Sequence, residues 1–360
     1  MLNFTVGPVM SSPEVIEVAN QSAPYFRTSE FSTIMRENET LMLEFLKAPQ
    51  ESHVVFLTAS GTGAMESCVM NILNDQDKVI VIDGGSFGHR FVQLVELHNL
   101  VYTIVKCEFG HQVKREQLDE LRGKGYTALL VNMDETSSGV LYDMELLSEF
   151  CKENNILLIV DAISAFITDE IDMEKLGAAA IITGSQKALA VQPGVSIIAL
   201  ATDALKRIEM NPEKCMYLSL KDALMNMMRG QTPFTPAVTT LLQINTRLKS
   251  IMSAGGIEKE REKIKKITTA VREWIERLPF EFVVENPKDR SNAVTAIHPT
   301  TCKATTIVEV LKNDYQIWVC PNGGERADEV FRIGHIGYIS MEDITTLMSA
   351  FEDMRTRGII

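Results

Sequence analysis

The sequence lacks the cysteine and histidine patterns that mark disulfide-rich or metal-binding proteins. Its six cysteines form no C-x-x-C pair and no regular spacing, and its six histidines show no metal-ligand spacing. We therefore expect reduced thiols, no disulfide framework and no metal site.

Long hydrophobic runs and an excess of basic residues are also missing. No apolar run approaches the ~18 residues that mark a membrane-spanning helix. The 35 basic residues are outnumbered by 48 acidic ones, giving a net charge of −13, so we expect neither nucleic acid nor an anionic membrane as a partner. The first residues show no basic segment followed by an apolar one. We therefore expect no signal peptide and a cytoplasmic location.

The 360 residues have the composition of an ordinary globular protein, with 45% hydrophobic and 23% charged side chains. Short apolar runs alternate with helical patterns from about residue 30 to residue 200. Seven of these runs are typical of buried strands: 53–59, 78–83, 101–107, 128–133, 156–161, 179–183 and 195–200. This alternation predicts an α/β fold with a mostly parallel seven-stranded sheet, covered by helices on both faces.

The pattern changes near residue 255, where a charged amphipathic helix begins and runs to about residue 278. Short strand and helix patterns follow it to residue 360. We therefore predict an N-terminal arm (1–15), a large domain (16–254) and a small C-terminal α/β domain (255–360).

Ligands of such sheets bind beyond the carboxyl ends of the strands, so residues that follow each predicted strand are candidates for a site. Ser60, Gly61, Thr62 and Gly63 follow the first run and open a helix. They can form a phosphate-binding turn or an ordinary capped helix start.

Asp161 closes one otherwise apolar run, and Lys187 lies shortly after another. A carboxylate in that position loses hydration and needs a compensating partner. That partner can be the backbone N–H groups of a helix that it caps, or a cationic nitrogen of a ligand. A lysine there is partly desolvated, which lowers its pKa, as in lysines that form Schiff bases.

Two other strand ends carry weaker signals. Phe87, among small residues, can be a flat platform for a planar ring or a core residue. The hydroxyl cluster of 134–139 is explained equally well by turn chemistry.

Together these segments resemble the class V aminotransferases, which bind pyridoxal 5'-phosphate (PLP) and have fold type I. The resemblance is closest to the alanine–glyoxylate, serine–glyoxylate and 2-aminoethylphosphonate–pyruvate branch. It covers nearly the whole chain, in the order of the family, through SGTGAME (60–66), GGSFGHR (84–90), ETSSGV (135–140), VDAIS (160–164), TGSQKAL (183–189), TPFTP (232–236) and FRIGHIG (331–337).

The resemblance implies roles for the residues around the cofactor ring. Lys187 matches the lysine that holds PLP as an internal aldimine and then transfers the substrate Cα proton. Asp161 matches the carboxylate that pairs with the pyridinium nitrogen. Phe87 matches the aromatic residue stacked on the ring, and Thr136 the hydroxyl beside its phenolic oxygen.

It also implies how the cofactor phosphate and the second subunit are arranged. Ser60, Gly61, Thr62 and Gln186 match residues that contact the phosphate. Thr235 matches a residue that reaches the phosphate in the other subunit, so the resemblance implies a homodimer with shared sites.

Arg332 matches the arginine that binds the substrate carboxylate through bidentate hydrogen bonds. The resemblance implies a ping-pong transfer of an amino group to a 2-oxo acid such as pyruvate or glyoxylate. The amino donor stays open, because the same arginine serves a small amino acid or an aminophosphonate.

The sequence departs from the family pattern at three places. The family's opening G-P-G-P is Gly7-Pro8 followed by Val9-Met10, which puts the N-terminal substrate contacts in doubt. Phe26-Arg27 stands where a His-Arg pair is frequent. Thr232 replaces a frequent tyrosine, so we expect that phosphate contact to be lost.

Parts of the sequence are also compatible with two alternative functions. Cys320 raises the alternative of a PLP-dependent lyase or cysteine desulfurase on the same fold, although Phe87 stands where those enzymes typically place a histidine. Gly61, Gly63 and Asp83 suggest an NAD-dependent oxidoreductase, but the third glycine of that fingerprint is missing.

Overall fold

The computed structural model describes residues 1–360 and contains a seven-stranded sheet in the order β2-β10-β9-β8-β5-β3-β4. Its strands are β2 (His53–Leu57), β3 (Lys78–Asp83), β4 (Val101–Lys106), β5 (Ala128–Asn132), β8 (Leu157–Asp161), β9 (Ala178–Gly184) and β10 (Ser196–Leu200). Every one of the seven predicted runs forms a strand of this sheet, which confirms that prediction.

The sheet is mostly parallel, as predicted. Only β10 runs antiparallel to its neighbours, β2 and β9, whereas the remaining pairs are parallel. The sequence did not reveal this reversal, because a strand buried on both faces is apolar throughout whichever way it runs.

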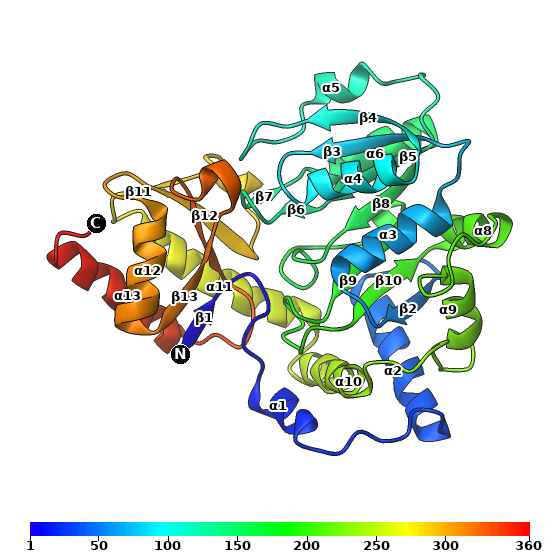
Figure 1. Ribbon diagram of the computed structural model, residues 1–360, viewed down its shortest axis with the longest axis horizontal. Helices are drawn as coiled ribbons and strands as arrows, with labels where there is room; N and C mark the ends of the chain where they lie inside the picture. The colour runs from blue at the N-terminus through cyan, green and yellow to red at the C-terminus, as the bar shows by residue number, and fades with distance from the viewer.

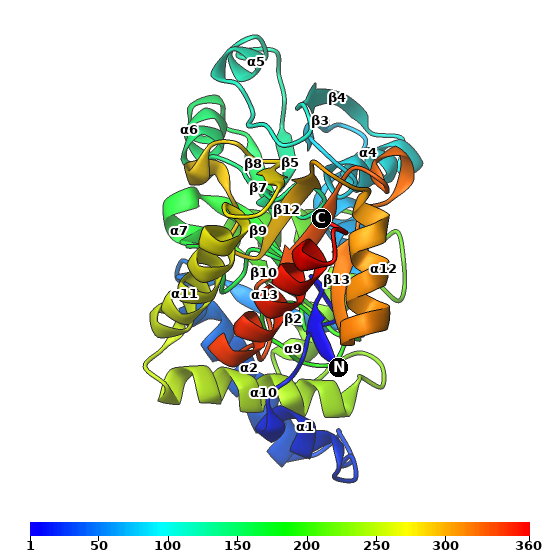
Figure 2. The same ribbon diagram turned by 90° about the vertical axis from the view of Figure 1, so that its left-hand side faces the viewer.

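Helices cover both faces of the sheet (Figures 1 and 2). Successive residues of β3 point to opposite faces, so Val79 and Val81 pack with α3 and α4 while Ile80 and Ile82 face the core shared with α2, α6 and α10. The helices of this part are α1 (Pro13–Ala19), α2 (Ser29–Phe45), α3 (Gly61–Ile72), α4 (Gly88–Leu97), α5 (Arg115–Asp119), α6 (Met144–Asn154), α7 (Met173–Leu176), α8 (Thr202–Met210), α9 (Leu220–Met227) and α10 (Val238–Ser253).

A second, five-stranded sheet has the order β1-β13-β14-β12-β11 and its own apolar core. It lies to the left of the larger sheet in Figure 1. Its elements are β1 (Leu2–Phe4), α11 (Ile257–Ile275), β11 (Phe280–Phe282), β12 (Val294–Pro299), α12 (Ala304–Tyr315), β13 (Ile317–Pro321), β14 (Phe331–Gly334) and α13 (Met341–Thr356), with short 3-10 turns at Pro287–Asp289 and Gly324–Arg326.

The first strand of the chain belongs to this second sheet, where β1 pairs in parallel with β13. The chain then crosses to the larger sheet, where α1 packs against α10. The segment predicted as an N-terminal arm therefore connects the two sheets. The domain boundaries themselves stay a prediction.

A short hairpin, β6 (Asp134–Glu135) and β7 (Val140–Leu141), follows β5 and encloses the predicted hydroxyl cluster. Val140 also forms a bridge with Arg290, from the part of the chain that builds the second sheet. The hairpin thus lies where the two parts of the molecule meet.

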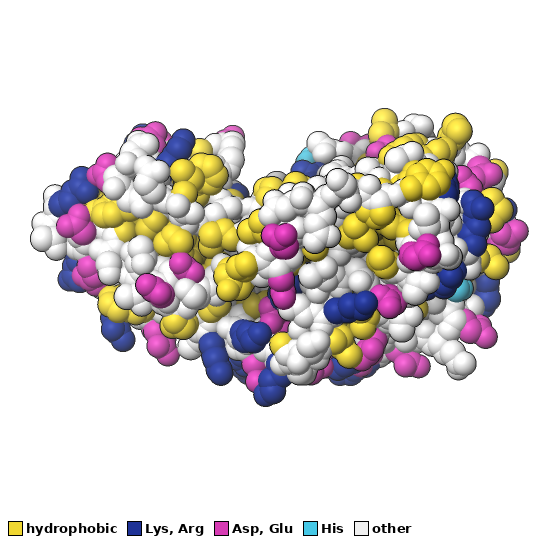
Figure 3. Space-filling model, turned by 90° about the horizontal axis from the view of Figure 1, so that it is seen from below, with side chains coloured by type: hydrophobic (Ala, Val, Ile, Leu, Met, Phe, Trp, Pro, Cys, Tyr) yellow, Lys and Arg dark blue, Asp and Glu magenta, His cyan; other side chains and the backbone are white.

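None of the helices has the length and apolar character needed to cross a membrane. On the face shown in Figure 3, Lys and Arg side chains are scattered among Asp and Glu and among hydrophobic groups. That face therefore has no basic stripe of the kind that follows a nucleic-acid backbone.

Candidate active site

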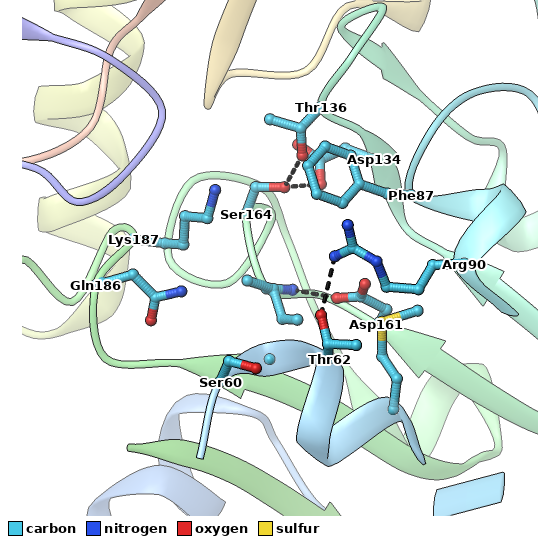
Figure 4. Close-up of a pocket in the computed structure, with 13 residues that line it drawn as sticks. Ser60, Thr62, Phe87, Arg90, Asp134, Thr136, Asp161, Ser164, Gln186 and Lys187 are labelled. Atoms are coloured by element: carbon cyan, nitrogen blue, oxygen red, sulfur yellow. Dashed lines mark hydrogen bonds between the residues drawn. The ribbon is translucent and has the colours of Figure 1, made fainter. Parts of the chain in front are cut away.

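A cavity of about 210 Å³ lies beyond the carboxyl ends of the strands of the large sheet (Figure 4). The structure brings eight of the predicted site residues together in its lining: Ser60, Gly61, Thr62, Phe87, Thr136, Asp161, Gln186 and Lys187. Arg90, Asp134 and Ser164, which the sequence interpretation passed over, also line it.

The N-terminus of α3 forms one wall of the cavity. Ser60 caps this helix, and its Oγ accepts a hydrogen bond from Gly63 N at 3.4 Å. A Cβ on Gly61 would lie 2.3 Å from Ile163 Cδ1, so a side chain here would displace the end of Ile163, which also lines the cavity. Free N–H groups and the positive end of the helix dipole make this wall suitable for an anion such as a phosphate.

Asp161 ends β8 and is buried. Its Oδ1 accepts a hydrogen bond from Ile163 N at 2.8 Å, and no protein group donates to Oδ2. Burial raises the pKa of Asp161 to about 6, while the Ile163 N–H and the charge of Lys187 act in the opposite direction. The free oxygen can therefore receive a hydrogen bond from a cationic nitrogen in the cavity.

Lys187 follows β9 on the opposite side of the cavity from Asp134 and Phe87 (Figure 4). Its Nζ donates a hydrogen bond to the carbonyl of Val6 at 2.6 Å. Burial lowers the pKa of Lys187, and the nearby negative charges of Asp134 and Asp161 partly oppose this effect. A buried amine with a lowered pKa is the form in which lysine acts as a nucleophile.

The N-terminal segment approaches this lysine closely. Gly7 has a positive φ of 122°, and a Cβ there would lie 2.7 Å from Lys187 Cδ and 3.0 Å from the carbonyl oxygen of Gln186. The altered G-P pattern therefore still packs on the site lysine. Sequence reasoning missed Val6, because its contribution is a backbone carbonyl without a side-chain signal.

Glu135 fixes the position of Phe87. This fully buried carboxylate accepts hydrogen bonds from the backbone N–H groups of Phe87 at 3.3 Å and Gly88 at 2.9 Å, at the start of α4. Arg90 lies on the Phe87 ring, 5.1 Å from its centroid, and donates to Thr62 Oγ1 at 3.0 Å. Both charged residues occur within the motifs quoted above, but their motif membership did not reveal these contacts.

Asp134, Ser164 and Thr136 form a hydrogen-bonded chain along one wall (Figure 4). Burial raises the pKa of Asp134 to about 7, against the hydrogen bonds from Ser164 and Ser291. Asp134 lies two residues beyond the end of β5, as Asp161 closes β8, so its place near a strand end was the available signal. The turn-like composition of 134–139 concealed it.

Arg332 and Thr235 are the two predicted site residues outside the lining. Arg332, on β14, donates to the Thr136 carbonyl at 3.0 Å and to the Pro321 carbonyl at 2.7 Å, and its Nε is buried without a partner. Its guanidinium is thus held beside a lining residue, with the Nε–H among the donors that have no protein partner. Thr235 lies on an exposed loop before α10.

The residues of the two alternative functions do not assemble into a site. Asp83 accepts a hydrogen bond from Lys106 at 2.9 Å and contacts His89 at 3.2 Å, and neither it nor Gly63 lines the cavity. Both contacts involve Oδ2 of this carboxylate, which the oxidoreductase hypothesis assigns to a dinucleotide ribose, and Oδ1 is buried without a partner. Cys320 is the register partner of Arg332 on the neighbouring strand and does not line the cavity either.

Comparison with known proteins agrees with this geometry. The family model for class-V aminotransferases matches residues 16–347. An uncharacterized aminotransferase of Methanocaldococcus jannaschii is 29% identical over 356 residues, covering 96% of this chain and 90% of that protein. The L-aspartate–glyoxylate aminotransferase of Paracoccus denitrificans is 25% identical over 344 residues, covering 94% of this chain and 86% of that protein.

Among solved structures, the subgroup IV aspartate aminotransferase of Thermus thermophilus superposes with a TM-score of 0.90 at 26% identity, covering 98% of this chain and 99% of that one. Fold type I is therefore confirmed, as is the enzyme class predicted from the motifs. The chain belongs to the class-V aminotransferases, a family of PLP-dependent enzymes.

Proposed function

We propose that the enzyme moves an amino group from a small amino acid, or an aminophosphonate, to a 2-oxo acid such as pyruvate or glyoxylate, and that it does so in the cytoplasm. The observation that carries the proposal is a single cavity that holds the Lys187 amine, the free Asp161 oxygen and the N-terminus of α3. The relative from Paracoccus denitrificans, named for aspartate and glyoxylate, supports this substrate class.

The cavity fits PLP in shape and charge. We assign Ser60, Gly61, Thr62 and Gln186 to the phosphate, because they gather at the positive end of α3. Phe87 would stack on the ring. When bound, the cofactor supplies an electron sink for the carbanion that forms at the substrate Cα.

Three residues would then tune and orient the ring. Asp161 would accept a hydrogen bond from the ring nitrogen through Oδ2 and, as an anion, keep that nitrogen protonated. Thr136, on the facing wall, would contact the phenolic oxygen. Phe87 holds its position because Glu135 anchors its backbone N–H.

Lys187 would attach the cofactor and carry the proton between the substrate Cα and the cofactor C4' atom. Its lowered pKa favours the neutral amine, which is the form that accepts a proton. The Val6 carbonyl orients Nζ within the cavity. In the first half of a ping-pong reaction Lys187 would move this proton away from the Cα of the amino donor. In the second half it would move a proton in the opposite direction, to the Cα derived from the 2-oxo acid.

Arg332 would bind the substrate carboxylate or phosphonate. Its two bonds to backbone carbonyls hold the guanidinium plane, and the buried Nε remains without a partner. Initial rates with alanine, serine, aspartate and 2-aminoethylphosphonate, each against pyruvate, glyoxylate and 2-oxoglutarate, would identify the substrate pair.

We also propose a homodimer in which Thr235 reaches the phosphate of the other subunit. Apolar side chains near its loop support a contact surface, because Met216, Met225 and Met228 are 78%, 64% and 80% exposed. Mixing Lys187→Ala with Thr235→Ala subunits would test this. Recovery of activity in the mixed dimer supports shared sites, and a monomer in sedimentation contradicts them.

The cofactor attachment can be tested directly. Borohydride reduction of the PLP-loaded enzyme should fix the cofactor on the peptide that contains Lys187, as read by mass spectrometry. The variant Lys187→Ala should carry no label, whereas Lys265→Ala, which removes an exposed lysine on α11, should be labelled like the wild type. Label on another lysine would contradict the assignment.

A further inference from the structure

Asp134 terminates a chain of hydroxyl groups that leads into the cavity. Its Oδ1 accepts from Ser164 Oγ at 2.5 Å, and its Oδ2 accepts from Ser291 Oγ at 2.8 Å. Thr136 Oγ1 lies 2.8 Å from Ser164 Oγ, and the Asp134 carboxyl is 2% exposed. Thr136 and Ser164 both line the cavity, whereas Ser291 belongs to the other part of the molecule.

Each hydroxyl has a single proton, so the charge of Asp134 dictates the direction of the chain. When Asp134 is ionised, Ser164 donates to it, and Thr136 has to donate to Ser164. Thr136 then presents only lone pairs to the cavity.

Protonation reverses this direction. Ser291 Oγ accepts from Ala293 N at 3.1 Å and keeps its own proton on Oδ2, so an added proton resides on Oδ1. Asp134 then donates to Ser164, Ser164 donates to Thr136, and the Thr136 proton points into the cavity.

We propose that Asp134 is a positioning residue whose proton decides whether Thr136 offers the cofactor ring oxygen a hydrogen-bond donor or only lone pairs. The inference rests on the proposed cofactor site. It assigns the second buried carboxylate of the cavity a role different from that of Asp161, although the two lie at the ends of the neighbouring strands β5 and β8.

The charges around Asp134 place its protonation change near neutral pH. Its pKa is about 7, raised by burial and by the negative charges of Asp169 and Asp161. Lys187, across the cavity, interacts favourably with the ionised form. Two more cations bind nearby backbone carbonyls, Arg272 that of Ser291 at 2.5 Å and Arg332 that of Thr136 at 3.0 Å.

Pyridoxine 5'-phosphate is a suitable probe for this chain, because it has the ring and phosphate of the cofactor but no aldehyde for Lys187 to attack. Its dissociation constant from cofactor-free enzyme can be measured by calorimetry from about pH 5.5 to about pH 9. Wild-type binding should weaken about tenfold as Asp134 ionises, since the complex loses one hydrogen bond to a charged oxygen.

The variants separate this step from ionisation of the probe itself. Asp134→Asn donates permanently from Nδ2 to Ser164 and accepts from Ser291, so its affinity should match the low-pH wild type and lack the step. Ser164→Ala interrupts the chain and should also lack the step. Ser138→Ala removes a buried hydroxyl that bonds only the Glu135 carbonyl and should keep it.

Identical pH profiles in wild type, Asp134→Asn and Ser164→Ala would overturn the inference. If Asp134→Asn does not fold, as judged by circular dichroism, the profile of Ser164→Ala decides alone. A probe that binds none of the proteins at any pH would instead overturn the proposed cofactor site.

Discussion

The two sheets contribute to the cavity in different ways. The large sheet supplies charged and aromatic side chains at or shortly beyond the ends of its strands, such as Phe87, Asp161 and Lys187. The smaller sheet and the segments around it supply mostly groups that hold others in place: the Val6 carbonyl on Lys187 and the Ser291 hydroxyl on Asp134. The comparison suggests that one part provides the chemistry and the other fixes the geometry.

Removing a side chain that the large sheet supplies should have the largest effect on turnover. Lys187→Ala loses both the cofactor attachment and the group that moves the Cα proton, so turnover should fall at least ~10³-fold. Single-turnover absorbance measurements with added PLP check this. Lys265→Ala is the matched control, and a Lys187→Ala enzyme within tenfold of wild type would remove Lys187 from the chemistry.

Arg332 lies on the smaller sheet but is assigned to substrate binding. It therefore tests whether the smaller sheet only holds other groups in place. Arg332→Lys keeps the charge but loses the planar fork, and KM for the carboxylate substrate should rise ~10–100-fold with a smaller change in kcat. Arg326→Lys, which alters an exposed arginine paired with Glu329, is the control. A fall in kcat alone would mean that Arg332 serves the chemistry instead.

A substitution in the N-terminal segment tests whether this segment positions Lys187, with a smaller expected effect. Gly7→Ala forces a Cβ toward Lys187 Cδ and should displace the Val6 carbonyl, lowering kcat/KM roughly tenfold. Gly123→Ala is matched to it, because Gly123 also has positive φ but open space around its Cβ position. Equal activity of the two variants would show that the segment does not position Lys187.

Asp134 should produce the smallest effect, in the pH dependence of stability. Its folded pKa of about 7 lies above the ordinary 3.8, so the folded state binds the extra proton and the free energy of unfolding falls as pH rises from about 4 to about 7. Urea unfolding of the cofactor-free protein should show this fall reduced by on the order of 2 kcal/mol in Asp134→Asn.

The raised pKa of Asp161 leaves a residual fall in the Asp134→Asn variant. Asp203→Asn, on the exposed side of α8, should keep the wild-type slope. A slope in Asp134→Asn equal to that of wild type would show that Asp134 is not held protonated by the fold.

The comparison also explains what the sequence could predict. Buried strands leave continuous apolar runs, so the seven strands and the residues after them could be located from the sequence alone. The antiparallel direction of β10 could not be predicted, because a strand buried on both faces is apolar in either direction.

Groups that act across the two sheets were not predictable in the same way. Ser291 and Asp134 are 157 positions apart in the chain, and the sequence around neither residue indicates that they form a hydrogen bond. Val6 acts through its carbonyl, which every residue has. Arg332 was identified only through its motif, since an arginine on a short strand is otherwise unremarkable.

The pairing of β1 with β13 has a consequence for how the enzyme acquires its active form. Leu2 pairs with Ile317 and Phe4 with Val319, so this contact closes a loop of nearly the whole chain. Loop closure on that scale is entropically costly and slow compared with local pairing. The carbonyl that holds Lys187 lies just beyond β1, so pairing of the first strand with β13 brings this partner toward the lysine.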